Sequence, residues 1–165
     1  MATMLPYALG DVRANREGLL SLAQRARLMQ QLEQMQQNLK AYLLEFGVVN
    51  AVFLTMLIIG GVELGGVLGV TLAMMAFMLA FERLAGARAR RLAADVAAQR
   101  VNMLQGPIQR FTWLDRAGIK RYGVKIEGHL FTLPPHIYHA LNDELCYRIY
   151  YTPRTHTLLS MEALA

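Results

Sequence analysis

The sequence has little of the chemistry that enzymes use. It contains one cysteine, Cys146, which excludes an internal disulfide and is compatible with a reducing compartment. The motifs G-x-S-x-G, H-E-x-x-H and C-x-x-C and the phosphate-binding P-loop are all absent. We therefore expect no enzymatic activity, no catalytic residue and no cofactor.

Histidine is also scarce, and its spacing is a poor match to a metal site. His136 and His139 stand three residues apart, while His129 and His156 lie elsewhere in the C-terminal part of the chain. A zinc site needs three or four converging ligands with supporting hydrogen bonds. We expect surface histidines and no bound metal.

Charge is almost missing from residues 46–81, where Glu63 is the only charged residue. This run is too long for one membrane-spanning helix, which needs about 20 residues. The glycine-rich stretch GGVELGG at 60–66 permits a tight reversal with Glu63 at its apex. The pattern predicts a transmembrane helical hairpin with spans at about 46–62 and 64–81.

Lysine and arginine flank this run on both sides. Residues 1–45 hold five, residues 82–105 hold five, and the turn at 60–66 holds none. The positive-inside rule then predicts that both termini are cytoplasmic, in the inner (plasma) membrane of a cell. Because orientation accounts for the net charge of +5, no nucleic acid is expected as a partner.

Small residues recur every fourth position in each predicted span. Such stripes let helix backbones approach closely in lipid, so we expect them to pack the two spans together or to contact a second copy of the chain. The candidate helix-packing residues are Gly47, Ala51 and Thr55 in the first span and Gly65, Gly69 and Ala73 in the second. Asn50 is expected to hydrogen-bond between the helices.

Amphipathic patterns continue on both sides of the apolar run. Ser21 and Gln24 form a capping box that predicts a helix start at residue 22. Heptad seams at 22–45 and 82–105 predict an antiparallel coiled-coil stalk of roughly 36 Å, ending at Gly106-Pro107. The seams comprise Leu28, Leu32, Met35, Leu39, Tyr42 and Phe46, and Ala85, Ala89, Leu92, Val96, Gln99 and Met103.

In this stalk Met35 should face Leu92. The alternative is a pair of amphipathic helices that lie on the membrane surface. Residues 22–105 thus form a long helical hairpin in either case, and residues 1–21 are a separate N-terminal segment in which no chemistry is readable.

Residues 106–165 read as a small antiparallel β module of the SH3-like or OB-like kind. Five strands are expected, with one short helix that begins at the prolines of PPHIYHAL. Glu127-Gly128 should turn one hairpin, and a turn at Pro153 should pair Ile149 with Leu158 in the last one. The fold class is therefore an α+β membrane protein.

Two stretches resemble a known group of sequences. ANREGLLSLAQR at 14–25 and the ending YRIYYTPRTHTLLSME at 147–162 are similar to those of uncharacterised bacterial two-span membrane proteins that end in a small β domain. The combination of membrane helices with a β module also resembles NfeD-like proteins, which join membrane helices to an OB-fold. The resemblance implies this architecture and no activity.

Taken together, the patterns predict an integral membrane scaffold or anchor that presents a cytoplasmic β interaction module. Alternatives are an accessory subunit of a larger membrane protein complex, and a component of a membrane enzyme or transporter. Membrane lipid and a protein partner, or a second copy of the chain, are the expected contacts. Tyr150, Arg148 and Arg154 are the candidate interaction residues.

Overall fold

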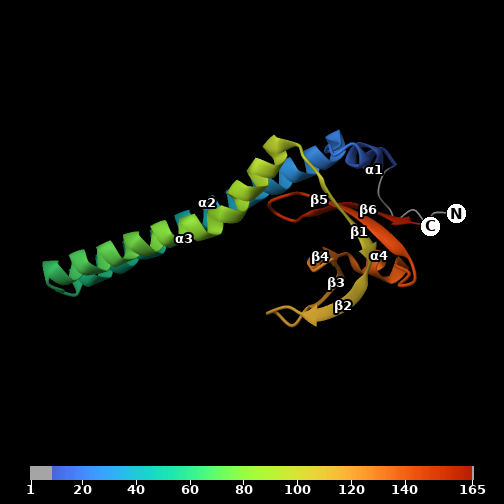
Figure 1. Ribbon diagram of the computed structural model, residues 1–165. Helices are drawn as coiled ribbons and strands as arrows, with labels where there is room; N and C mark the ends of the chain where they lie inside the picture. The colour runs from blue at the N-terminus through green and yellow to red at the C-terminus, as the bar shows by residue number, and fades with distance from the viewer. Residues whose placement is uncertain (1–8, 165) are drawn as a thin grey trace. The chain divides into compact units, whose positions relative to one another are not determined.

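The computed structural model describes residues 9–164 and shows an α+β protein with two long apolar helices and two small antiparallel sheets (Figure 1). The described residues form two units, one of residues 29–93 and one of residues 9–28 with 94–164. The helices are α1 (Leu9–Arg16), α2 (Leu22–Ile59), α3 (Leu64–Ala98) and α4 (Pro135–Ala140). The strands are β1 (Asn102–Pro107), β2 (Gln109–Leu114), β3 (Lys120–Ile126), β4 (His129–Leu133), β5 (Cys146–Tyr151) and β6 (Leu158–Leu164).

The start of α2 confirms the predicted capping box. The Gln24 backbone N–H donates to Ser21 Oγ at 3.1 Å, and the Ser21 N–H donates to Gln24 Oε1 at 3.2 Å. From there the helix continues without a break to Ile59. It ends where Gly60 and Gly61 follow, and Gly61 takes a φ of 74° that favours glycine.

The predicted end of the second long helix is wrong. We expected the helix to reach residue 105, but α3 ends at Ala98 because Gln99 adopts a left-handed φ of 52° and its N–H closes on the Asp95 carbonyl at 3.1 Å. Residues 102–107 instead form β1, where pairing with β5 satisfies their backbone groups. Gln99 and Met103 are therefore not positions of a helical seam.

Within residues 29–93, α2 and α3 run side by side in opposite directions (Figure 1). The rings of Phe46 and Phe77 lie 5.5 Å apart, and Leu39 Cδ2 lies 3.8 Å from the place where Gly86 would carry a Cβ. The predicted register would set Leu39 opposite Arg88, so the observed register is shifted by about half a helical turn.

The seam of α2 also departs from heptad spacing. Tyr42, a predicted seam residue, is 61% exposed, whereas Leu43 is half-buried. From Leu32 to Asn50 the less exposed positions of this seam are spaced 3-4-4-3-4. This spacing matches an eleven-residue repeat, which favours a right-handed supercoil, rather than the heptad of a left-handed coiled coil.

The small-residue stripes do not lie between the two helices. Five of the six candidates are exposed: Ala51, Thr55, Gly65, Gly69 and Ala73. Gly47 is half-buried, but apart from its chain neighbours and the backbone of its own helix no atom lies within 4 Å of the place where a Cβ would be. The larger residues Phe46 and Phe77 meet instead, so the stripes do not make the contact between α2 and α3 in this structure, and their contact with a second copy of the chain stays a prediction.

Polar side chains within the spans bond to their own helices. Asn50 Nδ2 donates to the Phe46 carbonyl at 2.7 Å, and Thr55 Oγ1 donates to the Ala51 carbonyl at 2.8 Å. A polar group in an apolar segment is satisfied most easily by the carbonyl four residues earlier. The prediction that Asn50 donates between the helices is therefore not what the structure shows.

The six strands form two three-stranded sheets with the orders β1-β5-β6 and β2-β3-β4. Only the buried Ile108 separates β1 from β2, so the two strands act as one bent strand shared by both sheets. The core lies between the sheets and beneath α4. It consists of Ile108, Val124, Ile126, Phe131, Leu133, Ile137, Leu141, Tyr147, Ile149, Tyr151 and Met161.

Turn chemistry explains which hairpin was predicted correctly. Glu127 and Gly128 both have positive φ values, 46° and 84°, and join β3 to β4 as a two-residue turn, as expected. The β5–β6 pairing was predicted wrongly. Ile149 pairs with Met161, not Leu158, because the connection spans six residues and an irregularity follows Tyr150.

Candidate functional site

The outer face of the β1-β5-β6 sheet carries a cluster of polar side chains that strand register brings together. Arg148 on β5 pairs with Gln105 on β1 and with Glu162 on β6. Tyr150 pairs with Ser160 in the next non-core position. Because Ile149 and Met161 point into the core, these neighbours must point to the opposite face.

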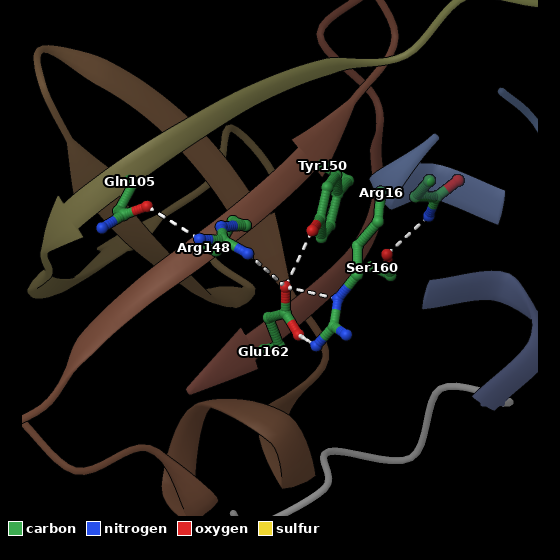
Figure 2. Close-up of polar contacts among 7 residues, drawn as sticks. Arg16, Gln105, Arg148, Tyr150, Ser160 and Glu162 are labelled. Carbon is green, nitrogen blue, oxygen red and sulfur yellow. Dashed lines mark hydrogen bonds and ion pairs between the residues drawn. The ribbon is translucent and has the colours of Figure 1, made fainter. Parts of the chain in front are cut away.

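The short helix α1 covers this face (Figure 2). Asn15 Nδ2 donates to Ser160 Oγ at 2.6 Å, and Arg16 Nε donates to Glu162 Oε1 at 3.3 Å. A second Arg16 nitrogen, Nη2, makes a short contact with the other oxygen of Glu162. The helix α1, in which the sequence showed no readable chemistry, thus supplies two hydrogen-bonding side chains to the cluster.

Glu162 is the centre of the cluster (Figure 2). Its Oε1 accepts the Tyr150 hydroxyl at 2.7 Å and Arg148 Nη1 at 3.2 Å, in addition to Arg16. Arg148 Nη2 continues the network to Gln105 Oε1 at 3.1 Å. Two cations and one hydroxyl therefore surround a carboxylate that is mostly buried.

The electrostatics of the cluster favour a fixed carboxylate. Burial opposes ionisation of Glu162, but hydrogen bonds from Arg16 and Tyr150 and the charges of Arg16 and Arg148 prevail, so its pKa is lowered. Burial and the bond to Glu162 raise the pKa of Tyr150. Glu162 remains an acceptor and Tyr150 a donor near neutral pH, which suits a structural clamp better than proton transfer.

A second buried carboxylate, Asp95, holds the β5–β6 connection. Its oxygens accept the Arg154 N–H at 3.0 Å, the Thr155 N–H at 2.8 Å and Thr155 Oγ1 at 2.8 Å. Asp95 is 1% exposed and lies on the last turn of α3. The start of α2 is held in a similar way, since the buried Gln24 donates Nε2 to the Leu159 carbonyl at 3.4 Å.

The three candidate interaction residues have different surroundings. Tyr150 is 1% exposed and Arg148 is half-buried in the Glu162 cluster, so neither offers a free binding surface. Only the Arg154 side chain is exposed. Tyr150, a candidate interaction residue, is buried because α1 covers the face that the strand pattern left open.

Arg16, Asp95 and Glu162 were missed by sequence reasoning. Their partners stand between 12 and 146 residues away in the chain, and no sequence motif links them. The available signal was the mixed character of YRIYY, in which an arginine and a tyrosine alternate with core residues. That pattern indicates a polar outer face, but not which segment covers it.

The histidines form no metal cluster. His129 and His156 stack at 5.5 Å beside the Tyr151 ring, while His139 lies against Tyr122 and Tyr138. Among residues 9–164, no three His, Cys, Asp or Glu side chains come together as metal ligands. Cys146 is a free, exposed thiol at the start of β5.

Comparisons with protein-family models, curated proteins and solved structures gave no match. The Glu162 carboxylate is paired with two arginines, and the Asp95 oxygens accept hydrogen bonds from Arg154 and Thr155. Each carboxylate joins segments that are far apart in sequence. This arrangement can hold α1, the start of α2 and the end of α3 to one β module.

Proposed function

We propose that this chain is an integral membrane scaffold or anchor that presents a non-catalytic β interaction module in the cytoplasm. One observation carries the proposal. α2 and α3 each contain an 18-residue window of mean hydropathy 2.0 and 2.1, and none of the residues in these windows is buried. Apolar surface of this extent in water is strongly unfavourable, whereas in lipid it needs no further cover.

The orientation follows from charge. The turn between α2 and α3 carries Glu63 and no basic residue, while lysine and arginine lie beyond the other end of each apolar segment. With the turn outside, both termini and the β module are cytoplasmic. The exposed thiol of Cys146 is compatible with a reducing compartment.

We infer an OB-like module rather than an SH3-like one. An OB-fold is a five-stranded, partly open barrel. Counting β1 and β2 as one bent strand gives five strands around one core, with α4 between the third and the fourth. The Glu162 cluster supports a non-catalytic role, because its carboxylate and the Tyr150 hydroxyl are both held in hydrogen bonds.

A second candidate function is that of accessory subunit in a larger membrane complex. The exposed stripe of Gly65, Gly69 and Ala73 on α3 favours it, as does the stripe of Ala51 and Thr55 on α2. Small residues on a lipid-facing surface allow the backbone of another helix to approach closely. The partner helix could come from a second copy of this chain or from another protein.

The orientation can be tested with thiol labelling in intact cells. Glu63→Cys should react with a membrane-impermeant maleimide from outside, whereas native Cys146 should react only after the membrane is made permeable. Cys146→Ser combined with Glu63→Cys isolates the first signal. Labelling of residue 63 only from the cytoplasmic side, or release of the chain by alkaline carbonate, would overturn the proposal.

The scaffold role needs a separate measurement. Mass spectrometry of the full chain extracted in mild detergent should show co-purifying protein chains in fixed proportion. A preparation that contains only single copies of this chain would contradict both the scaffold and the accessory-subunit function.

A further inference from the structure

The β2–β3 hairpin ends in a turn (Figure 1) whose two large apolar side chains are not covered by any described residue of their unit. Leu114 is 69% exposed and Ile119 is 54% exposed, and they flank the turn on either side. Exposure of large apolar side chains to water is unfavourable. Their position at the end of a hairpin makes them accessible to a flat surface.

The turn that carries them is rigid. Asp115 Oδ1 accepts the backbone N–H groups of Ala117 and Ile119, both at 2.9 Å, and Gly118 takes a positive φ of 74°. Asp115 Oδ2 also accepts Arg121 Nε at 2.8 Å. The two apolar side chains are therefore held on an ordered support, and little entropy is lost when they dock.

Basic charge surrounds the apolar tip. Residues 109–126 contain five lysines and arginines and a single acid, Asp115, which is paired with Arg121. Arg116 and Lys120 are exposed at the turn itself, with Lys120 Nζ 5.6 Å from the centre of the Tyr122 ring. The tip thus combines hydrocarbon with positive charge.

Trp113 lies just behind the tip. It stacks on Phe111 at 5.1 Å, and both rings lie so close to Gly123 that a Cβ there would meet them at 2.8–2.9 Å. At a membrane interface, apolar side chains reach the acyl chains, while basic side chains and tryptophan lie at the headgroups. The hairpin presents these residue types in the same order from its tip. A nucleic-acid platform would use the aromatic faces but has no use for exposed aliphatic side chains.

We propose that the β2–β3 hairpin docks on the anionic lipid surface of the bilayer that anchors the chain, with Leu114 and Ile119 inserted between headgroups. The inference rests on the proposed membrane function. Docking on the chain's own bilayer requires the stalk of residues 22–45, roughly 36 Å long when upright, to tilt toward the membrane. Tethering then gives the module a high effective concentration at that surface. Anionic headgroups complement Arg116 and Lys120.

Trp113 supplies the test, because it is the only tryptophan of the chain. The full chain is placed in nanodiscs of brominated phosphatidylcholine with or without phosphatidylglycerol, and Trp113 emission is recorded. We expect quenching in the anionic discs. Leu114→Asp with Ile119→Asp should abolish it, whereas Leu130→Asp, an exposed apolar position on β4, should not.

Charge gives a second, graded readout. Arg116→Gln should lower the ratio of docked to undocked hairpin about fivefold, since each basic residue near an anionic surface contributes about that factor. Raised salt should have the same direction of effect. Equal quenching in neutral and anionic discs, or none in either, would overturn the inference.

Two further arms separate the alternatives. In the first, brominated vesicles are added to unbrominated discs, and quenching of Trp113 only by these vesicles would contradict docking on the chain's own bilayer. In the second, oligothymidylate is added, and a change of Trp113 emission with oligothymidylate alone would indicate a nucleic-acid surface. Co-elution of the chain with discs reports membrane insertion independently. A chain that elutes without lipid overturns both proposals, while an inserted chain with unquenched Trp113 overturns only this one.

Discussion

Removal of the Asp95 carboxylate should destabilise the β module more than its single charge implies. In Asp95→Ala the backbone N–H groups of Arg154 and Thr155 lose their acceptors at a site that is 1% exposed. A buried donor left unpaired costs about 1–3 kcal/mol, and these two N–H groups are only partly buried, so the expected loss in free energy of unfolding is about 2 kcal/mol. The Thr155 hydroxyl adds little, because Thr152 and Thr157 lie within reach at 2.7 and 3.0 Å.

The assay is denaturant unfolding of the full chain in detergent, followed by the fluorescence of Trp113. The loss in free energy of unfolding should be about half as large for Asp95→Asn, since the amide keeps one acceptor oxygen. Asp143→Ala is the matched control, because its exposed carboxylate pairs with Arg110 at the surface and should be worth at most about 1 kcal/mol. A loss below about 1 kcal/mol for Asp95→Ala, or equal losses for both residues, would refute the reasoning.

Three further predictions concern the core, the Glu162 cluster and the helical hairpin. Ile149→Asp puts a charge at a position with 0% exposure and should cost more than about 3 kcal/mol by thermal melting, and a smaller loss would contradict its place in the core. The lowered pKa of Glu162 adds stability that is present above the unfolded pKa and lost as pH falls through the folded pKa. Glu162→Gln should therefore flatten the acid side of a stability–pH curve, and a curve unchanged in shape would contradict the cluster. Cysteines at Leu39 and Gly86, with Cys146→Ser, should crosslink within one chain, and crosslinks found only between chains would show that these faces serve association instead.

Local signals predicted local structure well. The capping box at Ser21, the glycines at 60–61 and the turn at Glu127-Gly128 each depend on neighbouring residues, and each lies where the sequence placed it. The two long apolar helices follow from composition alone. The start of α2 follows from the capping box, which depends only on residues three apart.

Features that depend on distant partners could not be predicted. The apolar spacing of residues 82–103 continues past Ala98, but β1 forms there because β5 offers it a full set of backbone partners. Tyr150 looked exposed because strand alternation says which side of a sheet a residue takes, not what covers that side. The covering segment, α1, lies 145 residues from Ser160.

That separation has a consequence for how the protein is made. Asn15 leaves the ribosome long before Ser160, and at about 5–20 residues per second the interval is roughly 7–30 seconds. During this time α1 has no sheet to cover, and the apolar α2 and α3 emerge between α1 and the strands of the β module. The module can close only after the last strand is released, so any factor that binds the nascent N-terminal segment would compete with β6 for it.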